Sequence, residues 1–250
     1  MALPPAHVPY RPFDPGVDPL TAATRFRETM DRRRSIRFFS DRPIERAVVE
    51  QLIAAAGTAP SGAHKQPWRF VAVQDPALKR RIREAAEAEE RAFYGGRASE
   101  RWLEDLTPFG TDPDKSFLET CPWLIVVFKL TRDDRPDAPS DQVYYVNESV
   151  GIATGMLISA IHHAGLCTLT HTPSPMKFLA DVLGRPDHER PFLLLPVGHP
   201  AEDCVVPDLH RKQLAEIMVL DDGGGGGDGG GPEPPVPPQP PAADDLHSAP

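Results

Sequence analysis

A cluster of arginines lies near the start of a chain that is otherwise acidic. The run RRRSIRFF, residues 32–39, holds four arginines and one serine in six positions. Guanidinium groups are rigid forks of N–H donors that match the oxygens of a phosphate. A solvated charged patch at a helix end is the alternative, and these residues alone leave both interpretations open. The two phenylalanines that follow would anchor the segment to a core, so a small phosphate-bearing ligand is one hypothesis.

A rigid, polar junction follows between an expected helix and an expected strand. GTAPSGAHKQPWRF, residues 57–70, contains two prolines, two glycines, a serine and a histidine, where a connection usually needs only a few residues of turn. Ser61 and His64 do not indicate a nucleophile and base, because no G-x-S-x-G elbow surrounds the serine. Small residues instead let backbone amides approach a flat ring closely. The junction therefore predicts a surface for a planar ligand.

Two further sets of residues have spacings that could do chemistry. Glu90 and Tyr94 stand four apart and share a face of an expected helix, with Lys115 across a loop-like stretch. Surface charge on an acidic helix is the alternative interpretation. Hydroxyls alternate in Thr168, Thr170 and Thr172, which would point to one side of a strand. Ordinary threonine β-propensity is the alternative there.

Composition excludes several classes of protein. The net charge of −9 over 250 residues argues against nucleic-acid binding. No apolar run approaches the roughly 20 residues of a membrane helix, and no secretory signal opens the chain. Three scattered cysteines without a C-x-x-C predict free thiols in a cytoplasmic protein and no metal site. Neither a G-x-G-x-x-G nor a P-loop motif is present, which argues against those nucleotide-binding folds.

The elements that would position these residues alternate between helices and short apolar strands. Helices are predicted at 21–34, 44–56, 76–94, 115–120, 142–165 and 175–183, and strands at 69–74, 123–130, 166–172 and 192–198. Residues 95–114 read as a mobile excursion between helices. The helix at 142–165 is nearly apolar with small residues, which predicts burial in a core or a dimer interface. The fold class is therefore mixed α and β.

The motifs, taken in order, resemble those of iodotyrosine deiodinases, which are nitroreductase-like flavoproteins. The similarity runs from about residue 32 to residue 219 and includes RRRSIRFFSDRPI, AAGTAPSGAHKQPWRFVAVQDP, EERAFY, KSFLETCPWLIVVFK, YYVNESVGIATGMLISAIHHAGL, TLTHTP, LLLPVGHP and VPDLHRKQLAEIMV. The combination of the junction motif with Glu90, Tyr94 and Lys115 is the part most specific to the deiodinases.

The resemblance implies an α+β, nitroreductase-like three-layer sandwich. Its central sheet would be mixed and mostly antiparallel, flanked by helices, in an intertwined homodimer with two FMN sites across the subunit interface. We expect an extended proline-rich arm at 1–19, an FMN-binding domain at 20–220 with a lid at about 95–114, and a disordered Gly/Pro-rich tail at 221–250.

The resemblance also implies residue roles. The FMN phosphate and ribityl chain would be held by Arg33, Arg34, Ser35, Arg37 and Arg211, and the flavin would be lined by Pro60, Ser61, Gly62, Thr170, His171 and Thr172. A threonine hydroxyl, Thr172 in preference to Thr170, would act catalytically by donating to flavin N5. The substrate phenolate would meet the Ala63 amide. Glu90 would bind the substrate ammonium group, and Tyr94 and Lys115 its carboxylate.

The implied activity is FMN-dependent reductive dehalogenation of halotyrosines, such as iodotyrosine to tyrosine plus iodide, through a flavin semiquinone. A general FMN nitroreductase or quinone reductase, and a non-catalytic flavin-binding protein, are the alternatives. The electron donor would be an NAD(P)H-linked reductase or a flavodoxin- or ferredoxin-type protein. The sequence departs from the family pattern at His171, where threonine is usual, and in the glycine and proline residues of the lid.

Overall fold

The computed structural model describes residues 7–221, so the predicted tail beyond Asp221 and the first six residues of the predicted arm lie outside the described residues. The chain divides into two compact units, Met1–Asp208 and Leu209–Pro250. In the described part of the second unit, α8 (Leu214–Ile217) begins with a capping box between Gln213 and Glu216. Within residues 7–221, no helix is long and apolar enough to cross a membrane.

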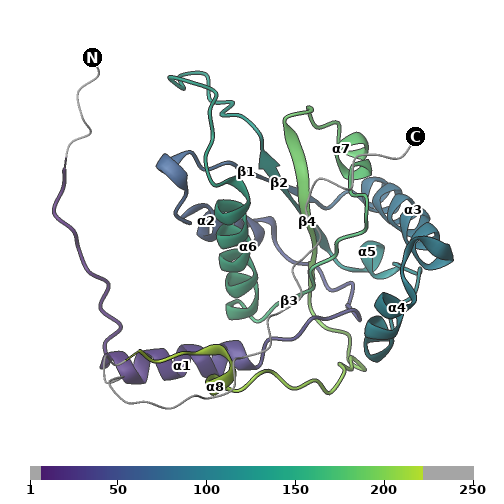
Figure 1. The fold of residues 1–250 in the computed structure, drawn as a ribbon, viewed down its shortest axis with the longest axis horizontal. Helices are drawn as coiled ribbons and strands as arrows, with labels where there is room; N and C mark the ends of the chain where they lie inside the picture. The colour runs from purple at the N-terminus through teal and green to yellow at the C-terminus, as the bar shows by residue number, and fades with distance from the viewer. Residues whose placement is uncertain (1–6, 222–250) are drawn as a thin grey trace, which may run out of the picture. The chain divides into compact units, whose positions relative to one another are not determined.

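A four-stranded sheet lies at the centre of the first unit (Figure 1). Its strands are β1 (Trp68–Val73), β2 (Trp123–Leu130), β4 (Glu189–Gly198) and β3 (Cys167–Thr168), in that spatial order. The named strands pair antiparallel, and an isolated bridge between Ser35 and Thr168 is parallel. The expected mixed, mostly antiparallel sheet is therefore confirmed.

Alternating side chains of β2 divide the core into two halves. Leu124, Val126 and Phe128 join the cluster beneath α3 (Pro76–Ala92), α5 (Phe117–Thr120) and α7 (Phe178–Val182). Ile125 and Val127 join the cluster beneath α2 (Arg46–Gly57) and α6 (Val146–His163). Because successive side chains of a strand point to opposite faces, this one largely buried strand supplies both halves. Figure 1 shows the resulting helix–sheet–helix layers, which confirm the expected three-layer sandwich.

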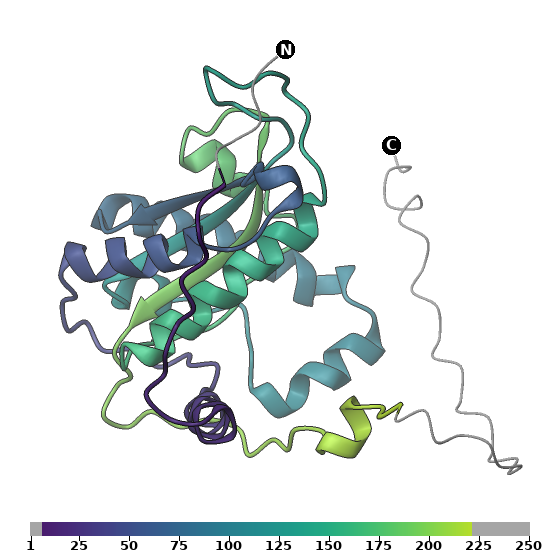
Figure 2. The same cartoon turned by 90° about the vertical axis from the view of Figure 1, so that its left-hand side faces the viewer.

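The first helix packs against α6 from outside the sandwich. α1 (Pro19–Asp31) begins at Asp18, whose side chain accepts from the backbone N–H of Thr21 at 3.0 Å. At its other end the Thr29 carbonyl lies 2.8 Å from His162 Nε2, and Figure 2 shows α1 end-on below α6. The prediction that this helix covers 21–34 is wrong at both ends. The helix starts earlier because Asp18 caps it and a proline occupies its first position. It ends at Asp31, before the arginine cluster.

Other predicted boundaries are also wrong, and two of them affect the candidate site. The long helix begins at Val146 and not at residue 142, since Tyr145 takes a left-handed conformation with φ 48°. The strand predicted at 166–172 pairs regularly only over Cys167–Thr168, followed by an isolated bridge between His171 and Leu194. Regular pairing ends at Thr168, which is buried, whereas Thr170 and Thr172 are exposed. The prediction that the three threonine side chains point to one side of a strand is therefore wrong.

Residues 95–114 contain regular structure that the sequence analysis missed. A π-helical turn at Phe93–Arg97 is followed by α4 (Glu100–Leu106) and a 3₁₀ turn at Thr107–Phe109. Ser99 caps α4 by accepting from the backbone N–H of Trp102 at 3.3 Å. The capping serine and the first-turn glutamate are a helix-start signal within the Gly- and Pro-rich stretch.

The outer face of α6, formed by Asn147, Gly151, Ile152 and Gly155, is exposed in the single chain. A Cβ atom added at either glycine would meet nothing within 4 Å. Ile152 is 47% exposed at the centre of this face. An apolar side chain between two glycines leaves room for another helix to approach the backbone of α6 closely.

Candidate functional site

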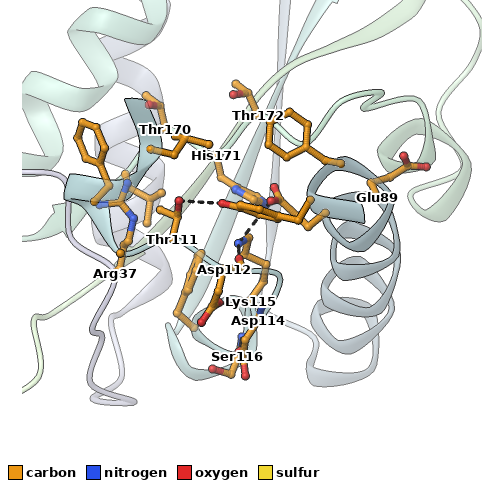
Figure 3. Close-up of a pocket in the computed structure, with 18 of the residues that line it drawn as sticks. Arg37, Glu89, Thr111, Asp112, Asp114, Lys115, Ser116, Thr170, His171 and Thr172 are labelled. Carbon is orange, nitrogen blue, oxygen red and sulfur yellow. Dashed lines mark hydrogen bonds and ion pairs between the residues drawn. The ribbon is translucent and has the colours of Figure 1, made fainter. Parts of the chain in front are cut away.

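A cavity of about 490 Å³ lies beside α3 and α5 and gathers residues from distant parts of the sequence (Figure 3). Seven of the residues singled out in the sequence line it: Arg37, Glu90, Tyr94, Lys115, Thr170, His171 and Thr172. Aromatic and apolar side chains complete its wall, among them Phe93, Trp102, Leu106, Phe109 and Phe117. The cavity therefore combines an apolar wall with a few polar groups, as small-molecule sites do.

A buried ion pair forms the charged part of the cavity. Lys115 Nζ lies 3.6 Å from Glu90 Oε2, and the two side chains are only 7% and 14% exposed. The ammonium group also donates to the backbone carbonyl of Asp112. Burial raises the pKa of Glu90, and the nearby Lys115 charge opposes that shift. Because isolated buried charges are costly, we interpret this pair as part of a candidate functional site and not as ordinary surface charge.

The segment after α3 closes one side of the cavity through aromatic contacts. Tyr94 donates its hydroxyl hydrogen to Thr111 Oγ1 at 2.8 Å. The Phe93 ring packs edge-on against Tyr94 and Trp102, with ring centroids 5.3 and 4.9 Å apart. The Arg37 guanidinium carbon lies 5.8 Å from the centre of the Phe109 ring. Burial lowers the pKa of Arg37, so its charge lacks full hydration.

His171 is a second buried polar residue of this cavity, beside Lys115. Its backbone N–H donates to the Leu194 carbonyl at 2.9 Å, and its carbonyl accepts from Leu194 N–H at 3.1 Å. Its ring packs edge-on against Phe117 with centroids 6.0 Å apart. Burial, assisted by the positive charges of Lys115 and Arg37, lowers the pKa of His171 to about 3. The imidazole is therefore neutral at physiological pH.

One face of α3 holds the segment that carries Lys115. Lys79 Nζ donates to the carbonyls of Glu119 and Cys121, each at 2.8 Å. Arg83 lies 2.8 Å from Glu119, and Glu87 Oε1 accepts from the backbone N–H of Lys115 at 3.0 Å. The sequence analysis missed these residues, although their near-helical spacing before Glu90 was the available signal.

Replacing Glu87 with alanine should lower the free energy of unfolding by about 1.5–3 kcal/mol, because a partly buried hydrogen bond to a charged group is lost. Glu87→Gln keeps an acceptor oxygen and should cost less. Urea unfolding of both variants beside Glu84→Ala, at an exposed position of the same helix, measures the difference. Equal midpoints for Glu87→Ala and Glu84→Ala would contradict the holding role.

Comparison with known proteins identifies the family. Residues 30–199 match the model of the nitroreductase family. The iodotyrosine deiodinase of Haliscomenobacter hydrossis is 56% identical over 218 residues, covering 86% of this chain and 98% of that protein. The chain belongs to the iodotyrosine deiodinase branch of the nitroreductase family. The resemblance stated from the motifs is thus confirmed.

Other members of the branch are similar over most of the chain. Human iodotyrosine deiodinase 1 is 42% identical over 217 residues, covering 85% of this chain and 74% of that protein. Among solved structures, oxidized iodotyrosine deiodinase bound to FMN and 3-iodo-L-tyrosine aligns with a TM-score of 0.66 and 27% identity. That alignment covers 79% of this chain and 98% of the other.

The remaining arginines expected to act in this nitroreductase-family chain lie outside the first cavity. Arg33 and Arg34 line a second cavity of about 420 Å³ near the end of α6, together with Arg32 and Thr168. Arg34 donates to the Pro207 carbonyl. Arg211 lies in the second unit, Leu209–Pro250. In the first unit, the structure therefore brings only Arg37 of the arginine cluster to the first cavity.

The junction Pro60–Ala63 contacts α6 and not the cavity. The backbone N–H of Gly62 points to Ser149 Oγ at 3.4 Å, and a Cβ at Gly62 would stand 2.8 Å from the Tyr144 carbonyl oxygen, so glycine is required. Ala63, His64 and Gln66 take positive φ values of 49°, 55° and 49°. Such left-handed residues cost roughly 1–2 kcal/mol each and are concentrated at functional sites.

A cluster beside β4 could be mistaken for a metal site. One ligand atom each from Asp134, His188 and Glu189 lies within 4.8 Å of the others. However, Glu189 accepts from Arg185 at 2.6 Å and from Arg69 at 3.1 Å, and Arg69 also pairs with Asp134. Because guanidinium groups already neutralise both carboxylates, the cluster is an ion-pair network.

Proposed function

We propose that this protein is an FMN-dependent halotyrosine dehalogenase that converts iodotyrosine to tyrosine and iodide. The iodotyrosine deiodinase of Haliscomenobacter hydrossis is 56% identical to this chain. A similar solved structure is an iodotyrosine deiodinase bound to FMN and 3-iodo-L-tyrosine. The observation that carries the proposal is the buried Glu90–Lys115 pair beside Tyr94 in one cavity. A carboxylate suits an ammonium group, and a lysine and a phenol suit a carboxylate.

The residues of the cavity fit FMN. The partly dehydrated Arg37 suits an anionic group of FMN. Thr170 and Thr172 are exposed toward the cavity that they line. When bound, FMN supplies the two electrons that, with one proton, replace the carbon–iodine bond by a carbon–hydrogen bond and release iodide.

The chain's own residues would bind and orient both ligands. Glu90 would hold the substrate ammonium, with Lys115 and Tyr94 on its carboxylate, and the Ala63 N–H would donate to the phenolate. The phosphate and ribityl chain of FMN would be held by Arg33, Arg34, Ser35, Arg37 and Arg211. The ring system would be lined by Pro60, Ser61, Gly62, Thr170, His171 and Thr172. The hydroxyl of Thr172, in preference to that of Thr170, would donate a hydrogen bond to N5. Closure of residues 95–114 would exclude water.

These roles require two chains. Pro60–Ala63 lies on the α6 side of the sheet, whereas Glu90 and Lys115 lie on the α3 and α5 side. One chain therefore does not offer both sets to a single small ligand. We therefore propose a homodimer that pairs through the outer face of α6, with the junction of one chain beside the cavity of its partner.

The decisive assay combines binding and turnover. The FMN-loaded protein, reduced with dithionite without oxygen, should convert 3-iodotyrosine to tyrosine, seen by product chromatography. The fluorescence of bound flavin should be quenched by micromolar 3-iodotyrosine and not by an equal concentration of a nitroaromatic compound. Quenching and turnover with the nitroaromatic alone would favour the general nitroreductase, and binding of FMN without any turnover would favour the non-catalytic alternative.

The affinity for 3-iodotyrosine should fall on acidification at a pH above the ordinary glutamate value of 4.5, because burial raises the pKa of Glu90. The ionised carboxylate binds the ammonium group, so affinity is lost as pH falls through this raised pKa. Dissociation constants measured by fluorescence from pH 7 downward would show the loss. Glu90→Gln should remove this part of the pH dependence, and an unchanged profile in that variant would contradict the assignment.

A further inference from the structure

His171 has an imidazole nitrogen that the fold buries and leaves without a partner among the described residues. The residue is 6% exposed, and Nε2 lacks a hydrogen bond. The pair of backbone hydrogen bonds to Leu194 on β4, together with the Phe117 ring, fixes its position. A buried polar atom without a partner is costly, so a rigidly held one that lines a cavity indicates a missing ligand group.

The charges around His171 indicate which ligand group fits. Lys115 and Arg37 are the charged residues that act on its titration, and both are positive. Both also line the same cavity, and Figure 3 shows His171 on the strand side above the Lys115 side chain. Beside His171, these two cations would repel a ligand ammonium group and attract an anionic oxygen, whereas Glu90 in the same cavity would hold the ammonium group.

The neutral imidazole ring of His171 can act as a hydrogen-bond donor. An uncharged imidazole carries one N–H, and the tautomer with hydrogen on Nε2 can donate to an acceptor in the cavity. A carboxylate is an acceptor-only group with room for several donors. It can therefore accept from Lys115 and from His171 together, and from Tyr94 once that hydroxyl turns away from Thr111.

We propose that His171 Nε2–H donates a hydrogen bond to the carboxylate of the amino-acid substrate and so selects ligands that carry one. This inference rests on the proposed function, because it takes the ligand to be an amino acid. It assigns His171 to substrate recognition, in addition to the place at the flavin that the family resemblance implies. The selectivity would be against amines and phenols that share the halogenated ring and lack the carboxylate.

The test compares two ligands on the FMN-loaded protein. 3-Iodotyrosine and 3-iodotyramine share the ring and the ammonium group, and only the first has a carboxylate. His171→Ala should weaken 3-iodotyrosine binding about tenfold or more, since a hydrogen bond to a charged group is lost, and should change 3-iodotyramine binding less than twofold. His171→Gln, whose amide offers an N–H at similar reach, should restore 3-iodotyrosine binding to within about threefold.

Lys177→Ala, at an exposed residue outside the lining of the cavity, is the control and should leave both affinities unchanged. FMN affinity measured for each variant separates loss of cofactor from loss of substrate. If His171→Ala weakens both ligands equally, or neither, the carboxylate assignment is overturned while the proposed function stands. If the wild-type protein binds neither ligand, the proposed function fails and this inference fails with it.

Discussion

Replacing Lys115 with alanine is expected to weaken 3-iodotyrosine binding by about a hundredfold or more. The ammonium group lies 3.6 Å from Glu90 in a place where both side chains are largely buried. Its removal takes the cation away from the ligand carboxylate and leaves a buried glutamate without its partner. Truncating one partner of a buried charge pair between a protein and its ligand typically costs about 2–5 kcal/mol of binding free energy, and each 1.4 kcal/mol is a factor of ten in affinity.

Titration calorimetry of the FMN-loaded variant against 3-iodotyrosine measures this loss. Lys177→Ala, at an exposed lysine, is the matched control and should bind as the wild type does. 2-Iodophenol, which lacks the amino-acid part, should bind Lys115→Ala and wild type with similar affinity. If Lys115→Ala kept its affinity for 3-iodotyrosine, the charged pair would have no role in recognition and the proposed substrate would lose its main support.

Placing leucine at Gly151 or Gly155 is expected to separate the proposed dimer and to abolish stable FMN binding. Within one chain, a Cβ at either position meets nothing within 4 Å, so the fold of the monomer has space for the larger side chain. Leucine also favours a helix over glycine by roughly 0.8–1 kcal/mol. Any loss must therefore arise where a second chain approaches the outer face of α6.

Sedimentation velocity and the absorbance of bound flavin report the two effects, and circular dichroism should show that the helices are retained. Ala88→Leu adds the same side chain at an exposed position of α3 and should leave the protein dimeric and yellow. Variants at Gly151 and Gly155 that remain dimeric with full FMN content would show that chains associate through another surface.

The amino-acid sequence allowed the residues of the cavity to be predicted better than their surroundings. Glu90, Tyr94 and Lys115 do converge in one cavity, because the helix spacing fixes two of them and the motif order supplies the third. The length of β3 was not predictable, since β-branched residues favour a strand while actual pairing depends on the partner strand. The left-handed turn at Ala63 and His64 also carries no local signal, because neither residue type favours it strongly.

The division of the arginine cluster was also beyond the sequence. Arg37 faces the first cavity whereas Arg33 and Arg34 face the second, although only a few residues separate them. The chain leaves α1 at Asp31, and Ser35 then joins Thr168 in a bridge, which turns neighbouring side chains in different directions. Spacing alone shows that the residues are near one another and does not show which side of the backbone each one takes.

The placement of Pro60–Ala63 and Glu90 on opposite sides of one sheet affects how the reaction rate would depend on the concentration of the protein. If each reaction centre needs material from two chains, an isolated chain holds two incomplete halves and no whole centre. At low concentrations of the protein, the reaction rate would then rise more steeply than in proportion to the concentration. Once nearly all chains are paired, the rate would become proportional to the concentration. Abundance itself would act as a threshold, without any effector.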